Sequence, residues 1–173
     1  MFDPVKERFY RFLKSRRPFN YSQITDQLYI AAWPVGENYN EIVDLGVRLV
    51  INMDWVPADP KLNEAPLQVL TLVTHDSPVT PMPTEKIWTG VRAAGETIAK
   101  GDKVMVYCKV GRHRSATMAC CILVSQGRTA DEAIQLVREK RPVARPDHAN
   151  FKKVIKKFEK ERRAANPDST QSK

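Results

Sequence analysis

The sequence predicts a single α/β domain with a central, mostly parallel sheet flanked by helices. Short apolar runs alternate with segments of helical periodicity through most of the 173 residues, as expected where crossover helices join parallel strands. This length suits one domain with a substantial core, and a content of 42% hydrophobic and 28% charged residues is typical of globular proteins. We expect a basic, helical N-terminal extension over residues 1–23, the domain over 24–163, and a disordered tail over 164–173.

The first half of the domain is predicted to contain three strands and one helix. Residues 28–31 form a short apolar run typical of a strand. Residues 39–45 have helical spacing and stop at Gly46, since glycine often follows the last helical turn. Apolar runs at 47–52 and 67–73 predict two further strands. The helix between the first two strands therefore indicates a crossover connection.

The second half is predicted to be mainly helical around one strand. A loop rich in proline covers residues 74–83, and a short central strand covers 104–107. Apolar residues at helical spacing predict four helices, over residues 84–100, 115–125, 130–141 and 148–163. The almost wholly apolar second helix should be buried.

Charge and cysteine content restrict the functional classes. The net charge is +8 and its excess lies toward both ends, which favours anionic partners. The three cysteines show no disulfide framework or metal-site spacing, so we predict no metal and no cofactor. No nucleic-acid-binding module is recognisable, and no nucleic-acid partner is expected. Without an 18-residue apolar run or a signal peptide, the expected location is cytoplasmic.

The most informative segment runs from Tyr107 to Ser115, between the predicted central strand and the buried helix. A loop entering a helix N-terminus presents backbone N–H groups and the positive end of the helix dipole, which favours a bound tetrahedral anion. The same field favours a thiolate, so Cys108 is predicted to be a nucleophile. Arg114 could grip two phosphate oxygens through its planar guanidinium, and Ser115 could hydrogen-bond the sulfur.

The loop itself is predicted to bind the phosphate group of a substrate, and equally a free phosphate or sulfate ion. Gly111 would allow the loop to curl. The side chains of Arg112 and His113 are expected to point outward, so that only their amides contact the anion. The predicted phosphate-binding residues are Lys109, Val110, Gly111, Arg112, His113 and Arg114.

Cys-x5-Arg followed by Ser, with the mid-loop glycine, the preceding strand and the following apolar helix, resembles the signature loop of the cysteine-dependent phosphatases, specifically the small dual-specificity type. The resemblance covers roughly residues 24–160. It implies a phosphocysteine intermediate at Cys108 and an upstream aspartate that protonates the leaving oxygen. Asp76, at the end of a predicted strand, matches this acid. In the low-molecular-weight phosphatases the loop precedes the acid, which disfavours that family.

Several other polar residues have less specific interpretations. Small cysteine phosphatases usually carry His immediately before the cysteine, whereas this chain has Tyr107. Asn52 and Asp54 fit either ordinary turn residues or supports beneath the loop. Cys120 and Cys121 are interpreted as core residues of the buried helix. His75 is interpreted as a surface neighbour of Asp76, and His148 as a residue near the start of the last helix.

The resemblance leaves the substrate open. The first hypothesis is a phosphorylated protein, carrying phosphotyrosine, phosphoserine or phosphothreonine. The alternative is an anionic phospholipid, phosphatidylglycerophosphate or a phosphoinositide, because the loop is basic and the net charge suits an anionic surface. If the substrate is a phospholipid, the protein would also contact the membrane surface peripherally. Two other interpretations of the same loop stay open. One is a pseudophosphatase that only binds phosphorylated partners, and a more remote one is a sulfurtransferase.

Overall fold

A computed structural model describes residues 18–77 and 80–165. Its sheet has five strands in the order β1-β2-β5-β3-β4. β1 pairs antiparallel with β2, and the other neighbouring strands are parallel. The strands are β1 (Tyr21–Thr25), β2 (Leu28–Ala32), β3 (Val47–Asn52), β4 (Gln68–Thr71) and β5 (Lys103–Cys108).

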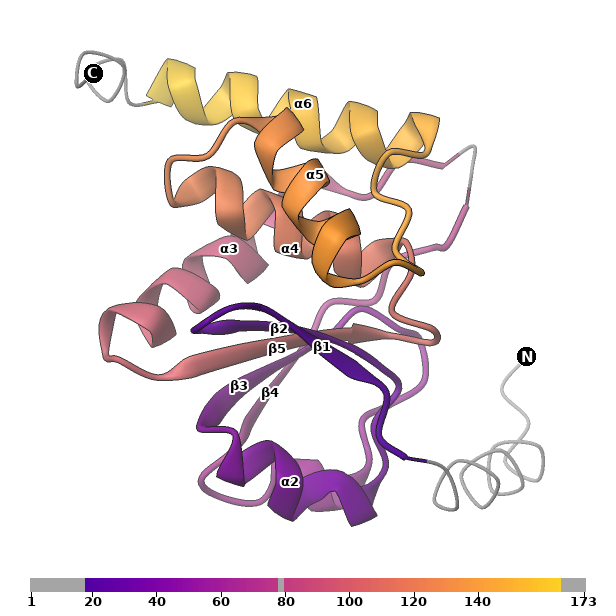
Figure 1. Ribbon diagram of the computed structural model, residues 1–173, viewed down its shortest axis with the longest axis vertical. Coiled ribbons are helices and arrows are strands. Elements are labelled where there is room, and N and C mark those ends of the chain that lie inside the picture. The colour runs from indigo at the N-terminus through magenta and orange to yellow at the C-terminus, as the bar shows by residue number, and fades with distance from the viewer. Residues whose placement is uncertain (1–17, 78–79, 166–173) are drawn as a thin grey trace.

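Helices cover both faces of this sheet unequally (Figure 1). One face carries α2 (Tyr39–Asp44), which follows the 3-10 turn η1 (Gly36–Asn38). A second 3-10 turn, η2 (Pro60–Asn63), precedes β4. The opposite face carries the remaining helices, which are α3 (Thr84–Ala99), α4 (Arg114–Ser125), α5 (Ala130–Lys140) and α6 (Ala149–Ala165).

The central strand β5 separates two hydrophobic clusters. Because side chains alternate along a strand, Val106 and Cys108 pack in the larger cluster with α3 to α6. Met105 and Tyr107 pack in the smaller cluster on the α2 side. The helix that follows, α4, is buried over all but its last residue, as its apolar sequence predicts. Cys108 and Tyr107 therefore face opposite sides of the sheet.

The predicted fold class is confirmed, but the N-terminal boundary needs a correction. The boundary placed between residues 23 and 24 falls inside β1, so residues 21–23 belong to the sheet and are not helical. β1 escaped prediction because only Ile24 of its five residues is buried, which leaves no apolar run. At the other end α6 continues to Ala165, past the predicted start of the tail at 164. The rest of the predicted extension, 1–17, and of the tail, 166–173, lies outside the described residues.

The helices formed by the described residues are too short or too polar to cross a membrane.

Candidate active site

The loop of residues 109–113 joins the carboxyl end of β5 to the start of α4 at the middle of the sheet. Gly111 has a φ of 71°, a conformation that favours glycine. A Cβ at this position would lie 2.7 Å from the carbonyl oxygen of Ala31 in β2. Glycine is thus required both by the backbone angle and by the close approach of the loop to the neighbouring strand.

The carbonyl groups of the loop are directed outward by a series of donors. The Lys109 carbonyl accepts a hydrogen bond from the Trp33 N–H at 3.4 Å, and the Arg112 carbonyl accepts one from the Arg145 N–H at 2.8 Å. In a trans peptide the N–H group points opposite to the carbonyl. The amides that follow these carbonyls therefore point into the loop, where together with the α4 N-terminus they form an anion-binding concavity.

The two carbonyls between these positions are held by Arg141, a residue that sequence analysis missed. Its Nε donates to the Gly111 carbonyl at 2.7 Å and its Nη2 to the Val110 carbonyl at 3.1 Å. The guanidinium also donates to Ser22 Oγ and to Asn20 Oδ1. Burial lowers the pKa of Arg141, while its electrostatic interaction with Cys108 acts in the opposite direction. At the end of α5, before a proline, Arg141 resembles any helix-terminal arginine, and its sequence carries no signal of this role.

Cys108 ends β5 and is almost completely buried. Its Sγ lies 3.2 Å from the Oγ of Ser115, in the first turn of α4. Ser115 is itself fully buried. The contact between Cys108 and Ser115 that the sequence suggested is therefore present.

The Arg114 guanidinium is held rigidly beneath the loop, with only 3% of the side chain exposed. Its Nη1 donates to the carbonyls of Met53 (3.0 Å) and Thr74 (3.2 Å). Its Nη2 donates to Asp54 Oδ2 at 3.0 Å. The Nε is buried and makes no hydrogen bond to the residues that the structure describes. Of the five N–H donors of the guanidinium, the Nε–H and the second Nη2–H thus remain for a ligand.

Asp54 and Asn52 are supports of this arginine. The Asn52 Oδ1 accepts the Asp54 N–H at 2.8 Å, and the Asn52 amide donates to the Val56 carbonyl at 2.9 Å. Both side chains are buried. Of the two interpretations open at the sequence level, the structure shows supports beneath the loop, because Asp54 contacts Arg114 directly.

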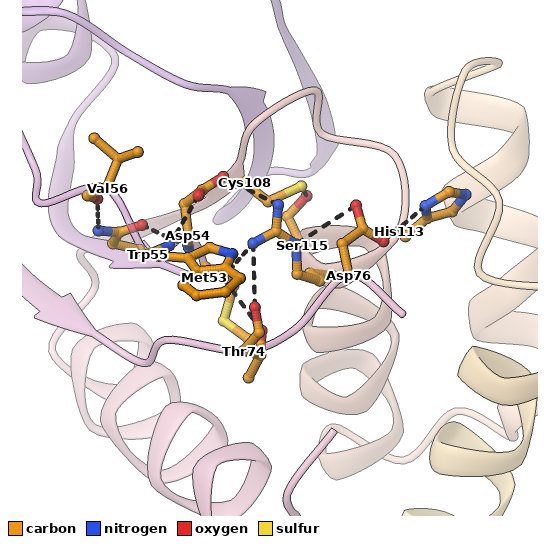
Figure 2. A network of polar contacts seen from close by, with 11 residues as sticks. Met53, Asp54, Trp55, Val56, Thr74, Asp76, Cys108, His113 and Ser115 are labelled. Carbon is orange, nitrogen blue, oxygen red and sulfur yellow. Dashed lines mark hydrogen bonds and ion pairs between the residues drawn. The ribbon is translucent and has the colours of Figure 1, made fainter. Parts of the chain in front are cut away.

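Asp76 lies at the mouth of the site with 40% of its side chain exposed. Its Oδ2 is 3.6 Å from Arg114 Nε, and its Oδ1 is 3.0 Å from His113 Nδ1. Figure 2 shows Asp76 between Ser115 and His113. The fold thus brings Cys108, Ser115, Arg114 and Asp76 into one network, although Asp76 comes from a segment far from the loop in sequence.

The expectation that the His113 side chain points outward is wrong. Its ring stacks on Phe151 of α6, with centroids 5.1 Å apart and planes 10° apart, and lies 6.0 Å from the His148 ring. The physical reason is that the start of α6 covers this side of the loop. Arg112, Lys109 and Val110 are exposed.

An exposed aromatic pair next to the network was also missed. Trp55 is 60% exposed, and its ring meets that of His75 edge to face at 4.8 Å. The Trp55 N–H donates to Asp54 Oδ1 at 2.8 Å, and His75 directly precedes Asp76. His75 is exposed, as predicted. The two rings therefore flank residues that contact Arg114.

The other two cysteines are core residues of α4, as predicted. Cys120 and Cys121 are fully buried and unpaired. Burial raises the pKa of both thiols. Over residues 18–77 and 80–165, no three His, Cys, Asp or Glu side chains are grouped in a way that could hold a metal ion.

Comparison with known families gives a match over residues 28–161 to the model for "Dual specificity phosphatase, catalytic domain". The chain belongs to the dual-specificity phosphatase family. This confirms the resemblance seen in the signature loop. Residues 28–161 are therefore the catalytic domain of a cysteine-dependent dual-specificity phosphatase.

Relatives of this phosphatase domain include dual specificity phosphatases and inositol diphosphatases. Dual specificity phosphatase 28 of Mus musculus is 28% identical over 146 residues, which cover 82% of this chain and 85% of the mouse protein. Inositol diphosphatase DSP5 of Arabidopsis thaliana is 24% identical over 111 residues, which cover 61% and 53% of the two chains. The crystal structure of PTPMT1 in complex with PI(5)P is 29% identical with a TM-score of 0.75, covering 84% of this chain and 97% of PTPMT1.

Proposed function

We propose that this domain hydrolyses phosphomonoesters through a phosphocysteine intermediate at Cys108. The observation that supports it best is the orientation of the loop: outward carbonyls direct its amides toward the space beside the sulfur. Three amides or more acting on one phosphoryl group, together with the α4 N-terminus, would stabilise its equatorial oxygens as negative charge develops. The amides that follow these carbonyls belong to Val110, Gly111, Arg112 and His113, and Arg114 supplies the first amide of α4.

In the first step the Cys108 thiolate attacks phosphorus and the ester P–O bond breaks. Asp76 donates a proton to the departing oxygen, which leaves as an alcohol. In the second step Asp76 takes a proton from water, the water oxygen attacks phosphorus, and the S–P bond breaks to release inorganic phosphate and the thiolate. The Ser115 hydroxyl, 3.2 Å from the sulfur, would donate a hydrogen bond to the thiolate that leaves.

Arg114 would stabilise the charge on the transferring phosphoryl group. Three of its four Nη–H donors are held by Met53, Thr74 and Asp54, so the planar group is oriented before substrate arrives. The free Nε lies on the side of Asp76. A preoriented donor loses no reorganisation energy during the reaction.

For the substrate we propose a phosphorylated protein, with phosphotyrosine as the preferred ester. The exposed rings of Trp55 and His75 beside the site could contact the phenyl ring of a phosphotyrosine, and contacts between aromatic rings are favourable beyond their buried area. A second candidate, an inositol phosphate or phosphoinositide, is supported by the likeness to PTPMT1, whose structure holds PI(5)P, and to inositol diphosphatase DSP5. The exposed Lys109 and Arg112 suit either anion.

The test measures phosphate release from a phosphotyrosine peptide, from phosphatidylglycerophosphate vesicles and from phosphoinositide vesicles in parallel. The Cys108→Ser protein is the blank, and it should lose turnover while still binding a phosphate analogue. Turnover retained by Cys108→Ser would refute the mechanism. Faster turnover of vesicles than of peptide would make the lipid the substrate. Phosphopeptide binding without any turnover by the unmodified protein would identify a pseudophosphatase.

A further inference from the structure

We propose that His113 is a positioning residue for Asp76, which holds one carboxyl oxygen so that the other faces the phosphoryl group. The inference rests on the proposed role of Asp76 as the general acid. The two carboxyl oxygens of Asp76 contact different residues. Oδ1 lies 3.0 Å from His113 Nδ1, whereas Oδ2 lies 3.6 Å from Arg114 Nε.

The Asp76 side chain has little else to orient it. It is 40% exposed, and residues 75–77 have no regular secondary structure. Among the described residues its carboxylate contacts two adjacent residues, His113 and Arg114. An exposed carboxylate on an irregular segment would otherwise sample several rotamers, and fixing one rotamer costs conformational entropy.

His113, in contrast, is held at both its backbone and its ring. Its carbonyl accepts hydrogen bonds from the N–H of Thr117 at 2.8 Å and from the Thr117 hydroxyl at 2.9 Å. Its ring stacks on Phe151 and is 25% exposed. The imidazole is therefore a fixed group on the phosphate-binding loop itself, and a hydrogen bond to it places Asp76 relative to that loop.

The two contacts of Asp76 change differently when a phosphoryl group binds. Arg114 Nε, a free donor, would turn its charge to a phosphate oxygen, which weakens its attraction for Oδ2. The His113 contact does not involve the phosphate and can persist. With Nδ1–H donating to Oδ1, the transferable proton resides on Oδ2, the oxygen that already faces Arg114 and hence the bound ester. Holding the reacting atoms in this geometry is the contribution of a positioning residue.

The experiment compares His113→Ala with His113→Asn, because the amide nitrogen of asparagine occupies nearly the position of Nδ1. The readout is kcat/KM, which reports cleavage of the P–O bond, for phenyl phosphate and for an activated ester, p-nitrophenyl phosphate. Since general acid catalysis contributes about 10²–10⁴-fold, His113→Ala should lower kcat/KM on phenyl phosphate about tenfold and on the activated ester by less than about threefold. His113→Asn should recover most of the loss.

His148→Ala is the matched control. Its ring also packs near His113 and Phe151, but the contacts given for Asp76 do not include it, so both rates should stay within about twofold of the unmodified protein. Equal losses on the two esters in His113→Ala, or an Asn variant as slow as the Ala variant, would overturn the positioning role. A full rate on the activated ester also shows that a variant is folded.

Asp76→Asn separates the inference from the proposed function beneath it. If Asp76 is the acid, Asp76→Asn lowers the phenyl phosphate rate most, and adding His113→Ala to it changes little, since His113 acts through the carboxyl. Multiplicative losses in the double variant would show that His113 acts independently, which overturns the inference and leaves the acid role standing. Equal losses on both esters in Asp76→Asn alone would refute the acid role, and the inference with it.

Discussion

Arg114 and Asp54 form a buried ion pair, with Nη2 3.0 Å from Oδ2 and exposed side-chain fractions of 3% and 7%. The pair joins the loop end of α4 to the segment that follows β3. Since Asp54 is in turn held by Asn52, the orientation of the guanidinium is set by residues remote from the loop in sequence. The plane of the Arg114 guanidinium is therefore already fixed before a substrate binds.

Asp54→Ala should lower both stability and activity. Removing one partner of a buried pair leaves the other charge unpaired, which typically costs roughly 3–5 kcal/mol. Urea unfolding of the variant measures this loss, and kcat/KM should fall because Arg114 is no longer oriented. The control is Glu64→Ala, which removes an exposed ion pair with Lys61 and should leave stability unchanged. An Asp54→Ala protein with unchanged turnover would contradict the orienting role.

Arg141→Met should loosen the phosphate-binding loop. The substitution keeps much of the side-chain volume but leaves the carbonyls of Gly111 and Val110 without their donors, and each lost hydrogen bond to a charged group costs about 1.5–3 kcal/mol. We expect weaker inhibition by inorganic phosphate together with lower stability. Arg138→Met, at an exposed position of the same helix, is the control. Unchanged phosphate inhibition in Arg141→Met would show that the loop keeps its shape unaided.

Alkylation should separate the three cysteines at neutral pH. The pKa of Cys120 and of Cys121 is raised by burial, so both remain protonated well above pH 7, and the thiol is far less reactive than the thiolate. Iodoacetamide should modify Cys108 alone and abolish turnover, and inorganic phosphate should protect it. Peptide mass spectrometry identifies the site. Modification of Cys120 or Cys121 in the folded protein at a rate similar to that of Cys108 would contradict this burial.

Tyr107→His should raise the phosphatase rate at a cost in stability. Small cysteine phosphatases usually carry His at this position, so the substitution restores the residue that precedes the nucleophile in the family pattern. Tyr107 is fully buried on the face opposite Cys108, so the smaller ring leaves unfilled volume, which destabilises by about 1–3 kcal/mol. The measurement is kcat/KM together with the melting temperature. Tyr107→Phe keeps the ring and should match the unmodified rate, whereas a slower His variant would disprove the expectation.

Trp55→Ala should reduce turnover of phosphotyrosine more than that of phosphothreonine. An aromatic contact contributes about 0.5–1.5 kcal/mol, so kcat/KM for a phosphotyrosine peptide should fall about two- to tenfold, with little change for a phosphothreonine peptide of the same sequence. Trp88 in α3 is unsuitable as a control because it is partly buried and packs against Phe158. Val143→Ala, at another exposed apolar position, is the control instead. Equal losses for both peptides would indicate a structural role for Trp55.

The sequence predicted most of the fold because apolar runs and helix caps are local patterns that form the same elements in the folded domain. The buried strands β2, β3 and β5 are mainly apolar, and α5 begins with a capping box of Thr129 and Glu132 that is recognisable in the sequence. β1 lacked such a pattern. Four of its five side chains are not buried, and its position depends on antiparallel pairing with β2.

The signature loop was predictable for a similar reason, because Cys108, Gly111, Arg114 and Ser115 are close in sequence and the spacing of the residue types carries the chemistry. By itself, the sequence determined the fold class, the family and the loop. Only the tertiary structure decided which remote groups serve it: Asp54 orients Arg114, Arg141 holds the loop carbonyls, and His113 meets Asp76. These contacts join residues from 30 to 60 positions apart. Local sequence patterns predict helices and strands, but they do not predict which distant side chains the folded sheet brings together.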